Sequence, residues 1–372
     1  MANMYYKKII KRSLLSFLLL AFFLTDASYL FSADEDENRS EQQEDKVASF
    51  KKSILSEAQT TSELIELLKQ RALLRVKKKK REQLLKFSVF ASLAGGYENN
   101  VNNDSSTKGD IFTSQFAMVG WNPIFNKHLG LNVNTLAFNQ IYSDFTDSNY
   151  LYAITNAGLR LYPFSDGRLR LEPGIGYESL WYPDSPLSSY SGMKYFLKTK
   201  NYLSRNFNID LNFEFSTKEY NTKKARNPSG VEMDFVREDE RYAFEAGITQ
   251  RIGRYSITIE EEAYRNTSND LLQDLNDYYA LKSSLNISGT FLEDRSLYVS
   301  FTPSFERKNY RVRLGRDNAR FDDRYNYKLA VYYTLNKNIS VSYRFDYWKL
   351  DSNNIAAEYE NVINQVGLSV RF

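Results

Sequence analysis

Several residue types that carry chemistry in other proteins are absent or rare in this sequence. The 372 residues include no cysteine, which excludes disulfides, thiolate metal sites, a cysteine nucleophile and a lipid-modified N-terminal cysteine. A single histidine, His128, leaves little scope for imidazole-based proton transfer. The formal net charge is only +3 for 49 basic and 46 acidic residues, so no overall field favours nucleic-acid binding. We therefore expect a protein that is not an enzyme, needs no cofactor or metal, and binds no nucleic acid.

Long hydrophobic runs are missing as well, with one exception near the N-terminus. The basic stretch Lys7–Arg12 precedes the apolar run Leu14–Leu24, which small or polar residues follow. At about eleven residues this run is shorter than the roughly 20 that a helix needs to cross a bilayer, which favours a cleaved secretory signal peptide over an anchor. We predict a signal peptide over residues 1–27, with cleavage after Ala27 and Ala33 as the alternative site. No comparable run follows, so the exported chain is either soluble or a β-barrel.

Aromatic side chains, in contrast, are abundant. They make up 15% of the sequence, with 28 tyrosines and 25 phenylalanines, while the mean hydropathy is -0.53. A soluble protein would bury so many aromatics in a core rich in aliphatic residues, whereas a membrane barrel spreads them over a lipid-facing band and both interfaces. The composition therefore favours the barrel.

Residues 28–85 form a polar preface to the rest of the chain. Acidic, amide and serine residues dominate positions 34–46, a composition that predicts a flexible linker. From position 47 to 85 apolar residues recur at roughly helical spacing, so we expect a short periplasmic helical segment. The basic run Lys77–Arg81 could bind anionic lipid headgroups or an acidic partner, although a solvated helix face also explains it.

From residue 86 onward the hydrophobic pattern changes to a period of two. Val299 and Phe301, for example, alternate with Ser300 and Thr302, which gives one face suited to lipid and one suited to water. The predicted fold is therefore all-β, a transmembrane antiparallel up-and-down β-barrel over residues 86–372. The fourteen predicted strands are 86–97, 110–121, 128–142, 149–162, 168–182, 190–203, 206–220, 239–252, 254–266, 277–291, 296–310, 323–336, 338–350 and 359–372.

The connections between these strands alternate between short and long. The first, residues 98–109, is long, and the short ones include 204–205 and the single residue Gly253. Bacterial outer-membrane barrels have short periplasmic turns and longer external loops, so this order predicts a periplasmic N-terminus in a Gram-negative outer membrane. A soluble β-sandwich is the alternative, but strands of twelve or more residues exceed the usual length in soluble sheets.

The C-terminal strand also resembles a known signal. Val366, Leu368, Val370 and Phe372 lie on one face of it, and the chain ends on the aromatic residue. Outer-membrane barrels carry a terminal strand of this kind for recognition by their assembly machinery. We therefore expect the barrel assembly machinery and outer-membrane lipids as partners.

The inward-facing residues of the predicted strands carry charges of both signs. Such charges can set a transverse field across an aqueous pore, or they can pair with one another inside a closed barrel. His128 lies beside the predicted turn 122–127 and is interpreted as an ordinary residue at the end of that turn. The candidate lumen-lining residues are Arg160, Arg168, Arg170, Glu172, Asp210, Glu214, Arg241, Glu245, Glu260, Glu262, Lys282, Arg344 and Asp346.

The stretch from Leu93 to Asn102 resembles the Gly-Tyr-Asp-x-Asn-Val-Asn opening of several barrels that follow a periplasmic domain. Surface lipoprotein assembly modifiers, which place a fourteen-stranded barrel after a helical-repeat domain, are one such family. That resemblance implies a role in the surface delivery of lipoproteins. The chain departs from the family because about fifty residues before the barrel cannot hold a stack of 34-residue repeats.

Three functions follow from these observations. The first is a channel or transporter for small polar solutes, which the polar inner face favours. The second is assistance in lipoprotein delivery, which only the resemblance supports. The third is a scaffold that displays external binding loops such as 221–238 and 311–322.

Overall fold

A computed structural model describes most of the chain from residue 87 onward, namely residues 87–104, 107–164, 166–227, 229–271, 276–311, 320–354 and 357–372. The predicted signal peptide (1–27) and the predicted linker and helical segment (28–85) lie outside the described residues. No helix in the described part of the chain is long and apolar enough to cross a bilayer.

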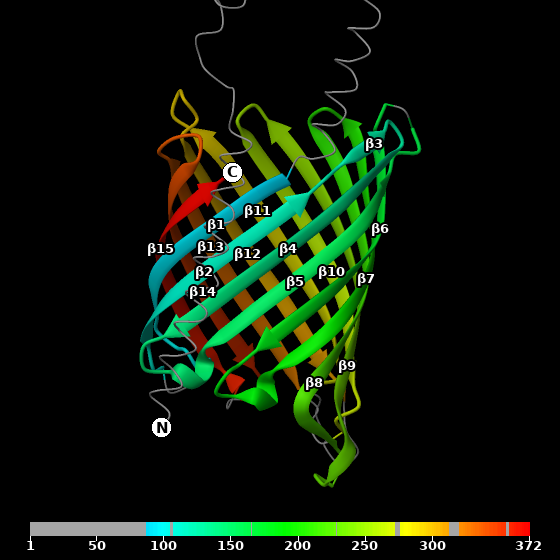
Figure 1. Cartoon of the computed structure of the whole chain (residues 1–372). Coiled ribbons are helices and arrows are strands. Elements are labelled where there is room, and N and C mark those ends of the chain that lie inside the picture. The colour runs from blue at the N-terminus through cyan, green and yellow to red at the C-terminus, as the bar shows by residue number, and fades with distance from the viewer. Residues whose placement is uncertain are drawn as a thin grey trace, which may run out of the picture. The chain divides into compact units, whose positions relative to one another are not determined.

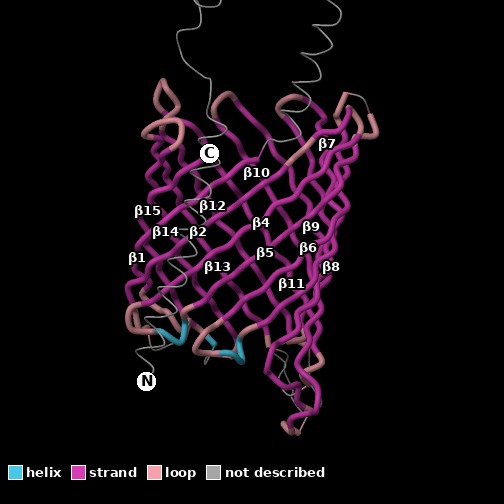
Figure 2. The backbone as a smooth tube through the Cα atoms, viewed as in Figure 1, coloured by secondary structure: helices cyan, strands magenta, loops and turns pink. Residues whose placement is uncertain are grey.

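Tilted β-strands account for nearly all of the described residues (Figure 1). Two short 3-10 helices, Thr146–Ser148 and Pro186–Ser188, lie in connections at one end of the barrel (Figure 2). The strands are β1 Phe87–Glu98, β2 Asp110–Trp121, β3 Ile124–Asn126, β4 Leu129–Tyr142, β5 Tyr150–Leu161, β6 Leu169–Trp181, β7 Tyr190–Ser204, β8 Phe207–Arg226, β9 Glu232–Ile252, β10 Tyr255–Ser268, β11 Tyr278–Phe291, β12 Leu297–Tyr310, β13 Phe321–Thr334, β14 Ile339–Ser352 and β15 Tyr359–Arg371.

The sheet closes on itself through its first and last strands. β1 pairs with β15 over nine positions, from Phe90 opposite Arg371 to Glu98 opposite Ile363, and with β2 on its other side. β2 pairs in turn with β4, and the three-residue β3 only extends the turn that joins them. Within the described residues the long strands thus form a closed antiparallel barrel of fourteen strands, which removes the exposed edges of an open sheet. The predicted fold class is confirmed.

The strands begin and end within two residues of the predicted limits, except at the connection between β8 and β9. Residues 221–238 were predicted as a loop, and this prediction is wrong for most of them. β8 continues to Arg226 and β9 begins at Glu232, so the two strands form a hairpin that projects beyond the other connections (Figure 1). A register irregularity between Glu219 and Lys224 marks the position where this projecting hairpin starts.

The short connections lie at the opposite end of the barrel from this hairpin (Figure 1). The turn between β9 and β10 shows the local reason for their tightness. Ile252 pairs directly with Tyr255, and only Gly253 and Arg254 lie between them. Gly253 has a φ of 59°, which the two-residue turns of β-hairpins require and which glycine adopts without steric cost.

Candidate functional site: the barrel lumen

Side chains that bond across an intervening strand identify the inner face of the barrel. The amide of Asn132 on β4 donates to Glu172 Oε1 on β6 at 2.7 Å, across β5. Gln365 on β15 likewise donates to Ser114 on β2, across β1. Side chains converge over an intermediate strand on the concave side of a closed sheet and diverge on its convex side. Because strand side chains alternate between faces, these contacts assign every second residue of each strand to the lumen.

The alternate residues form an apolar outer face. Large hydrophobic side chains on this face are between a third and two thirds exposed, as expected for a surface in contact with lipid rather than water. The terminal residues Val366, Leu368 and Phe372 belong to the same exposed set, and Val370 shares their face. Their recognition by the assembly machinery stays a prediction. Other members are Leu93, Ile175, Phe213, Ile248, Ile259, Leu281 and Phe301.

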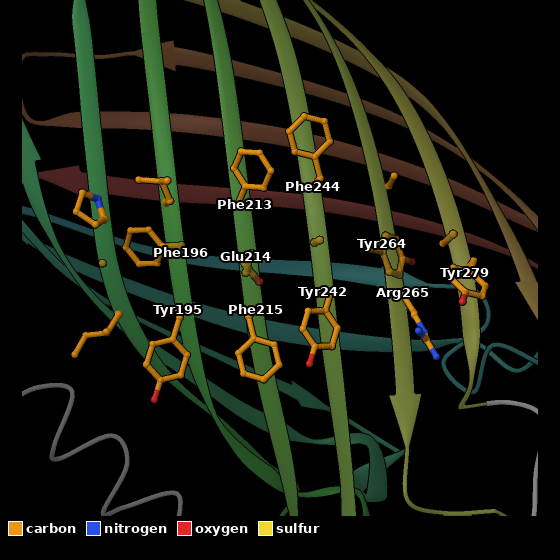
Figure 3. Close-up of a pocket in the computed structure, with 17 residues that line it drawn as sticks. Tyr195, Phe196, Phe213, Glu214, Phe215, Tyr242, Phe244, Tyr264, Arg265 and Tyr279 are labelled. Atoms are coloured by element: carbon orange, nitrogen blue, oxygen red, sulfur yellow. The ribbon is translucent and has the colours of Figure 1, made fainter.

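An aromatic-walled groove of about 1010 Å³ lies on the outer face over β6 to β11 (Figure 3). The ring centroids of Phe213 and Phe244 are 4.7 Å apart, and those of Phe215 and Tyr242 are 4.8 Å apart. In Figure 3 the hydroxyl of Tyr242 points toward the end where β10 finishes, whereas Phe213 and Phe244 lie further from that end. Tyrosine hydroxyls at one level and phenylalanines deeper in the wall are typical of a membrane interface. The groove therefore belongs to the lipid-facing surface and not to the lumen.

The inner face from β5 to β12 is dominated by ion pairs, most of them between neighbouring strands and the others within one strand or across an intervening strand. Most of the carboxylates and cations in these pairs are residues that the sequence pattern predicted to line the lumen. Side chains in water gain little from such pairs, but these are half-buried and hold each other in fixed positions. The pairs are Arg160–Glu172 (3.1 Å), Arg170–Glu172 (3.7 Å), Lys194–Glu214 (3.2 Å), Lys200–Asp210 (3.1 Å), Lys218–Glu178 (3.6 Å), Arg241–Glu262, Lys282–Glu262 (3.7 Å) and Lys308–Glu306 (3.6 Å).

Glu172 is the most buried carboxylate of this paired wall. Its side chain is only 3% exposed and accepts hydrogen bonds from Asn132 and from Arg160 Nε, while Arg170 Nε lies 3.7 Å away. Gly158 on β5 lies diagonally across from Glu172, and a Cβ atom at Gly158 would meet Glu172 Cγ at 2.9 Å. The absence of a side chain at Gly158 thus provides the space that this carboxylate occupies.

Two further predicted residues, Glu245 on β9 and Glu260 on β10, lie on the same inner face without a cation within 4.0 Å among the described residues. Glu260 accepts a hydrogen bond from the Ser284 hydroxyl at 3.2 Å. The neighbouring cations Arg241 and Lys282 both pair with Glu262, so Glu245 and Glu260 have no cation partner of their own.

Arg168 is placed differently from the prediction, because β6 begins one residue after it. It lies in the short turn after Pro163, with an exposed guanidinium 2.6 Å from Asp166 Oδ2 and over the ring of Phe164. The backbone N–H and guanidinium of Arg168 lower the pKa of the exposed Asp166 carboxyl below its usual value. The turn is thereby stabilised, but Arg168 takes no part in the pair around Glu172.

The inner face of β13 and β14 differs from the paired wall because its cations have no close acid partners. Arg324, Lys328 and Arg344 lie on this face, and no carboxylate of the described residues is within 4.0 Å of any of them. Arg344 is exposed, and its Nε donates to the Tyr332 hydroxyl at 3.1 Å. Asp346 lies opposite Lys328 and is the one nearby acid of the predicted set.

Next to Arg344 the lumen contains a hollow of about 540 Å³ that the sequence did not predict. Seven neighbouring strands, from β14 through β15 and β1 to β6, contribute inward-facing residues to it. Its wall on β2, β4 and β6 is mainly apolar, whereas the wall of an aqueous channel is usually polar. The lining comprises Ser92, Ala94, Ser114, Phe116, Leu136, Phe138, Tyr150, Tyr152, Leu180, Tyr182, Ser342, Arg344 and Gln365.

Inward-facing tyrosines form a belt near the long connections, which the sequence also did not reveal. Their hydroxyls donate to inward acids, as between Tyr310 and Asp322 at 2.8 Å and between Tyr152 and Glu178 at 3.1 Å. The rings contact one another in pairs with centroids 5.3 to 5.9 Å apart, which are Tyr150–Tyr182, Tyr190–Tyr220, Tyr264–Tyr278 and Tyr278–Tyr310. Such contacts hold the rim of the lumen in a defined shape.

His128 takes the position predicted for it, at the end of the turn before β4. Its Nδ1 lies 2.8 Å from the main-chain oxygen of Tyr162, and the main-chain N–H of Tyr162 donates to the His128 oxygen. The imidazole therefore joins two neighbouring turns.

No protein-family model matches the sequence, and no curated protein matches it significantly. Solved structures with a similar arrangement are outer-membrane proteins. A loop-deletion mutant of OmpT, an outer membrane protein of Vibrio cholerae, matches 77% of this chain and 99% of its own, with 10% identity and a TM-score of 0.42. OccK3 (OpdO) of Pseudomonas aeruginosa matches 80% and 98%, with 13% identity and a TM-score of 0.37. OccAB3 of Acinetobacter baumannii matches 77% and 99%, with 9% identity and a TM-score of 0.40. Similarity at this level does not indicate a function, so the function proposed below is inferred from the residues of this chain.

Proposed function

We propose that this protein is a channel for small polar solutes in the outer membrane of a Gram-negative-type envelope. One observation carries the proposal: a closed barrel has an apolar, exposed outer face and an inner face bearing charges of both signs. Charged groups facing lipid are costly, whereas the same groups facing a hydrated lumen are tolerated and can select solutes. The proposal requires no catalytic group or cofactor.

Charges without close partners support selective passage rather than mere structural pairing. Glu245 and Glu260 lie on β9 and β10, and the cations Arg324, Lys328 and Arg344 lie on β13 and β14. This separation along the wall creates a field within the lumen that a solute would experience. The short turns, with the N-terminus, would face the periplasm and the projecting hairpin the exterior.

The projecting β8–β9 hairpin favours a second candidate function, the display of a binding surface. Val231 is 61% exposed and Phe235 is 52% exposed, and both lie in the part of the hairpin beyond the register irregularity. Apolar side chains outside the lipid band are suited to contact a partner protein. Lipoprotein delivery, in contrast, rests on the Leu93–Asn102 resemblance alone.

Solute uptake tests the channel against the scaffold. Liposomes containing the refolded chain should swell in iso-osmotic solutions of small sugars and amino acids, and cells lacking the protein should take up such a solute more slowly. A variant with residues 224–234 replaced by a short glycine-serine turn should retain swelling. If the intact protein gives neither swelling nor an uptake defect, the channel proposal is wrong; loss of partner binding in the shortened variant would then support display.

A further inference from the structure

The unpaired cations and the apolar hollow lie next to each other in the lumen. Arg344 on β14 contributes to the lining of the hollow. Lys328 lies near Arg344, because the neighbouring strand β13 places Ala330 opposite Arg344 and Lys328 opposite Asp346. Along β5 to β12, by comparison, most inward cations have a carboxylate within 4.0 Å. On the β13–β14 wall Asp346 is the acid next to Lys328, but it lies beyond 4.0 Å of the charged groups of both Lys328 and Arg344, so these two cations outnumber it and Arg344 is available to a solute.

The opposite side of the hollow is mainly apolar, and the hydroxyls of Tyr150 and Tyr152 there already donate to Gln140 and Glu178. Phe116, Leu136, Phe138 and Leu180 present only carbon atoms to the space. The ring of Phe138 also contacts the ring of Tyr150, with centroids 5.7 Å apart, and Tyr150 contacts Tyr182, so three aromatic rings in contact adjoin these carbon atoms. A sugar or another polyhydroxylated solute would lose hydrogen bonds to water against such a wall, whereas an apolar or aromatic group would gain contact area.

We propose that this hollow selects organic anions with an apolar body, in particular aromatic carboxylates. The carboxylate would accept charge-assisted hydrogen bonds from the exposed guanidinium of Arg344, and the Ser92, Ser114 and Gln365 side chains supply further polar contacts. The ring of the solute would pack against Phe116, Leu136 and Phe138. The volume of about 540 Å³ lies within the range of small-molecule sites.

This inference rests on the proposed channel function, because it names the class of solute that the lumen prefers. Binding can nevertheless be measured without transport. The probe is 4-phenylbutyrate, compared with 4-phenylbutanol, which keeps the ring but lacks the charge, and with butyrate, which keeps the charge but lacks the ring. Equilibrium dialysis against the refolded full chain in detergent, referenced to empty micelles, gives the three affinities.

We expect 4-phenylbutyrate to bind about tenfold more tightly than either reference compound. Arg344→Gln should remove this advantage over 4-phenylbutanol, and Arg168→Gln, a matched change in an exposed turn, should leave it intact. Phe138→Ser should weaken the binding of 4-phenylbutyrate and leave the binding of butyrate unchanged, which gives an independent test of the apolar wall. Equal binding of 4-phenylbutyrate and 4-phenylbutanol, or unchanged binding to the Arg344→Gln variant, would overturn the inference.

Conductance of the same preparations separates the two proposals. Conductance together with charge-independent binding would leave the channel intact and refute the anion site. Binding that depends on Arg344, in a protein that never conducts, would support the site and refute the channel.

Discussion

The side-chain amide of Asn100 donates to the main-chain oxygen of Glu360 at 2.8 Å, although 260 positions separate the two residues. The main-chain N–H of Asn99 donates to the Val362 oxygen at 3.0 Å, and the Asn361 amide donates to Glu98 at 2.6 Å. These bonds join the loop after the first strand to the last strand. The Glu98–Asn100 part of the motif that suggested a family resemblance therefore fastens the seam of the barrel.

Removing one of these bonds should weaken the closed barrel. Asn100 is fully buried, its amide also donates to the Asp104 oxygen at 2.7 Å, and its Oδ1 accepts from the Asp104 main-chain N–H, so Asn100→Ala removes three side-chain hydrogen bonds at once. We expect the free energy of unfolding to fall by about 1–3 kcal/mol. Urea unfolding in lipid vesicles measures this, with Asn206→Ala in an exposed turn as the control. Equal stability of both variants would show that the seam does not depend on Asn100.

The paired wall should depend on its buried carboxylate. Glu172→Gln removes the negative charge between Arg160 and Arg170, which would then repel each other at a half-buried position. We expect a loss of about 1–3 kcal/mol in the free energy of unfolding. Asp166→Asn breaks the exposed ion pair between Asp166 and Arg168 and should change the free energy of unfolding little. Similar effects in the two variants would mean that the lumen wall is as solvated as the turn.

A charge introduced on the outer face should reveal which residues contact lipid. Val366 lies in the middle of β15 and is 58% exposed, and Val231, near the tip of the projecting hairpin, is 61% exposed. Val366→Arg should lower the free energy of unfolding in vesicles by about 2–4 kcal/mol, because arginine is costly near the bilayer midplane. Val231→Arg should have little effect. A large effect at Val231 would contradict the position of the hairpin outside the membrane.

The absence of cysteine permits a direct test of lumen hydration. Ser304 faces inward on β12, because it pairs with Ser284, and Phe305 faces outward. In vesicles, a membrane-impermeant methanethiosulfonate reagent should modify a Ser304→Cys variant much faster than a Phe305→Cys variant, since the thiolate must meet water. Mass spectrometry gives both rates. Faster reaction at position 305 would invert the assigned faces.

The fold could be predicted from the sequence because the two faces of each strand meet different environments. The alternation of Val299 and Phe301 with Ser300 and Thr302 reflects lipid on one side and the lumen on the other. Beyond the membrane this contrast disappears, because both faces of the hairpin meet water and residues such as Lys224, Glu232 and Asp234 are exposed. The projecting hairpin was therefore mistaken for a loop, although its backbone continues the two strands.

The candidate site could be predicted only in part. Residues such as Glu172, Asp210 and Glu262 were assigned to the lumen from alternation, and the structure places them there. The hollow beside Arg344 could not be found in this way, because Phe116, Leu136 and Phe138 break the rule that inward residues are polar. Their proximity to Arg344 also depends on the closure of β15 onto β1, which no local pattern encodes.

Single-channel conductance in a planar bilayer tests the central claim most directly. The chain from residue 28 and a shortened chain from residue 87 should both be refolded and inserted. The proposed channel predicts stable, stepwise conductance in at least the shortened chain, and conductance in that chain alone would assign a plugging role to the preceding residues. Silence of both chains, after folding is verified, would contradict the channel.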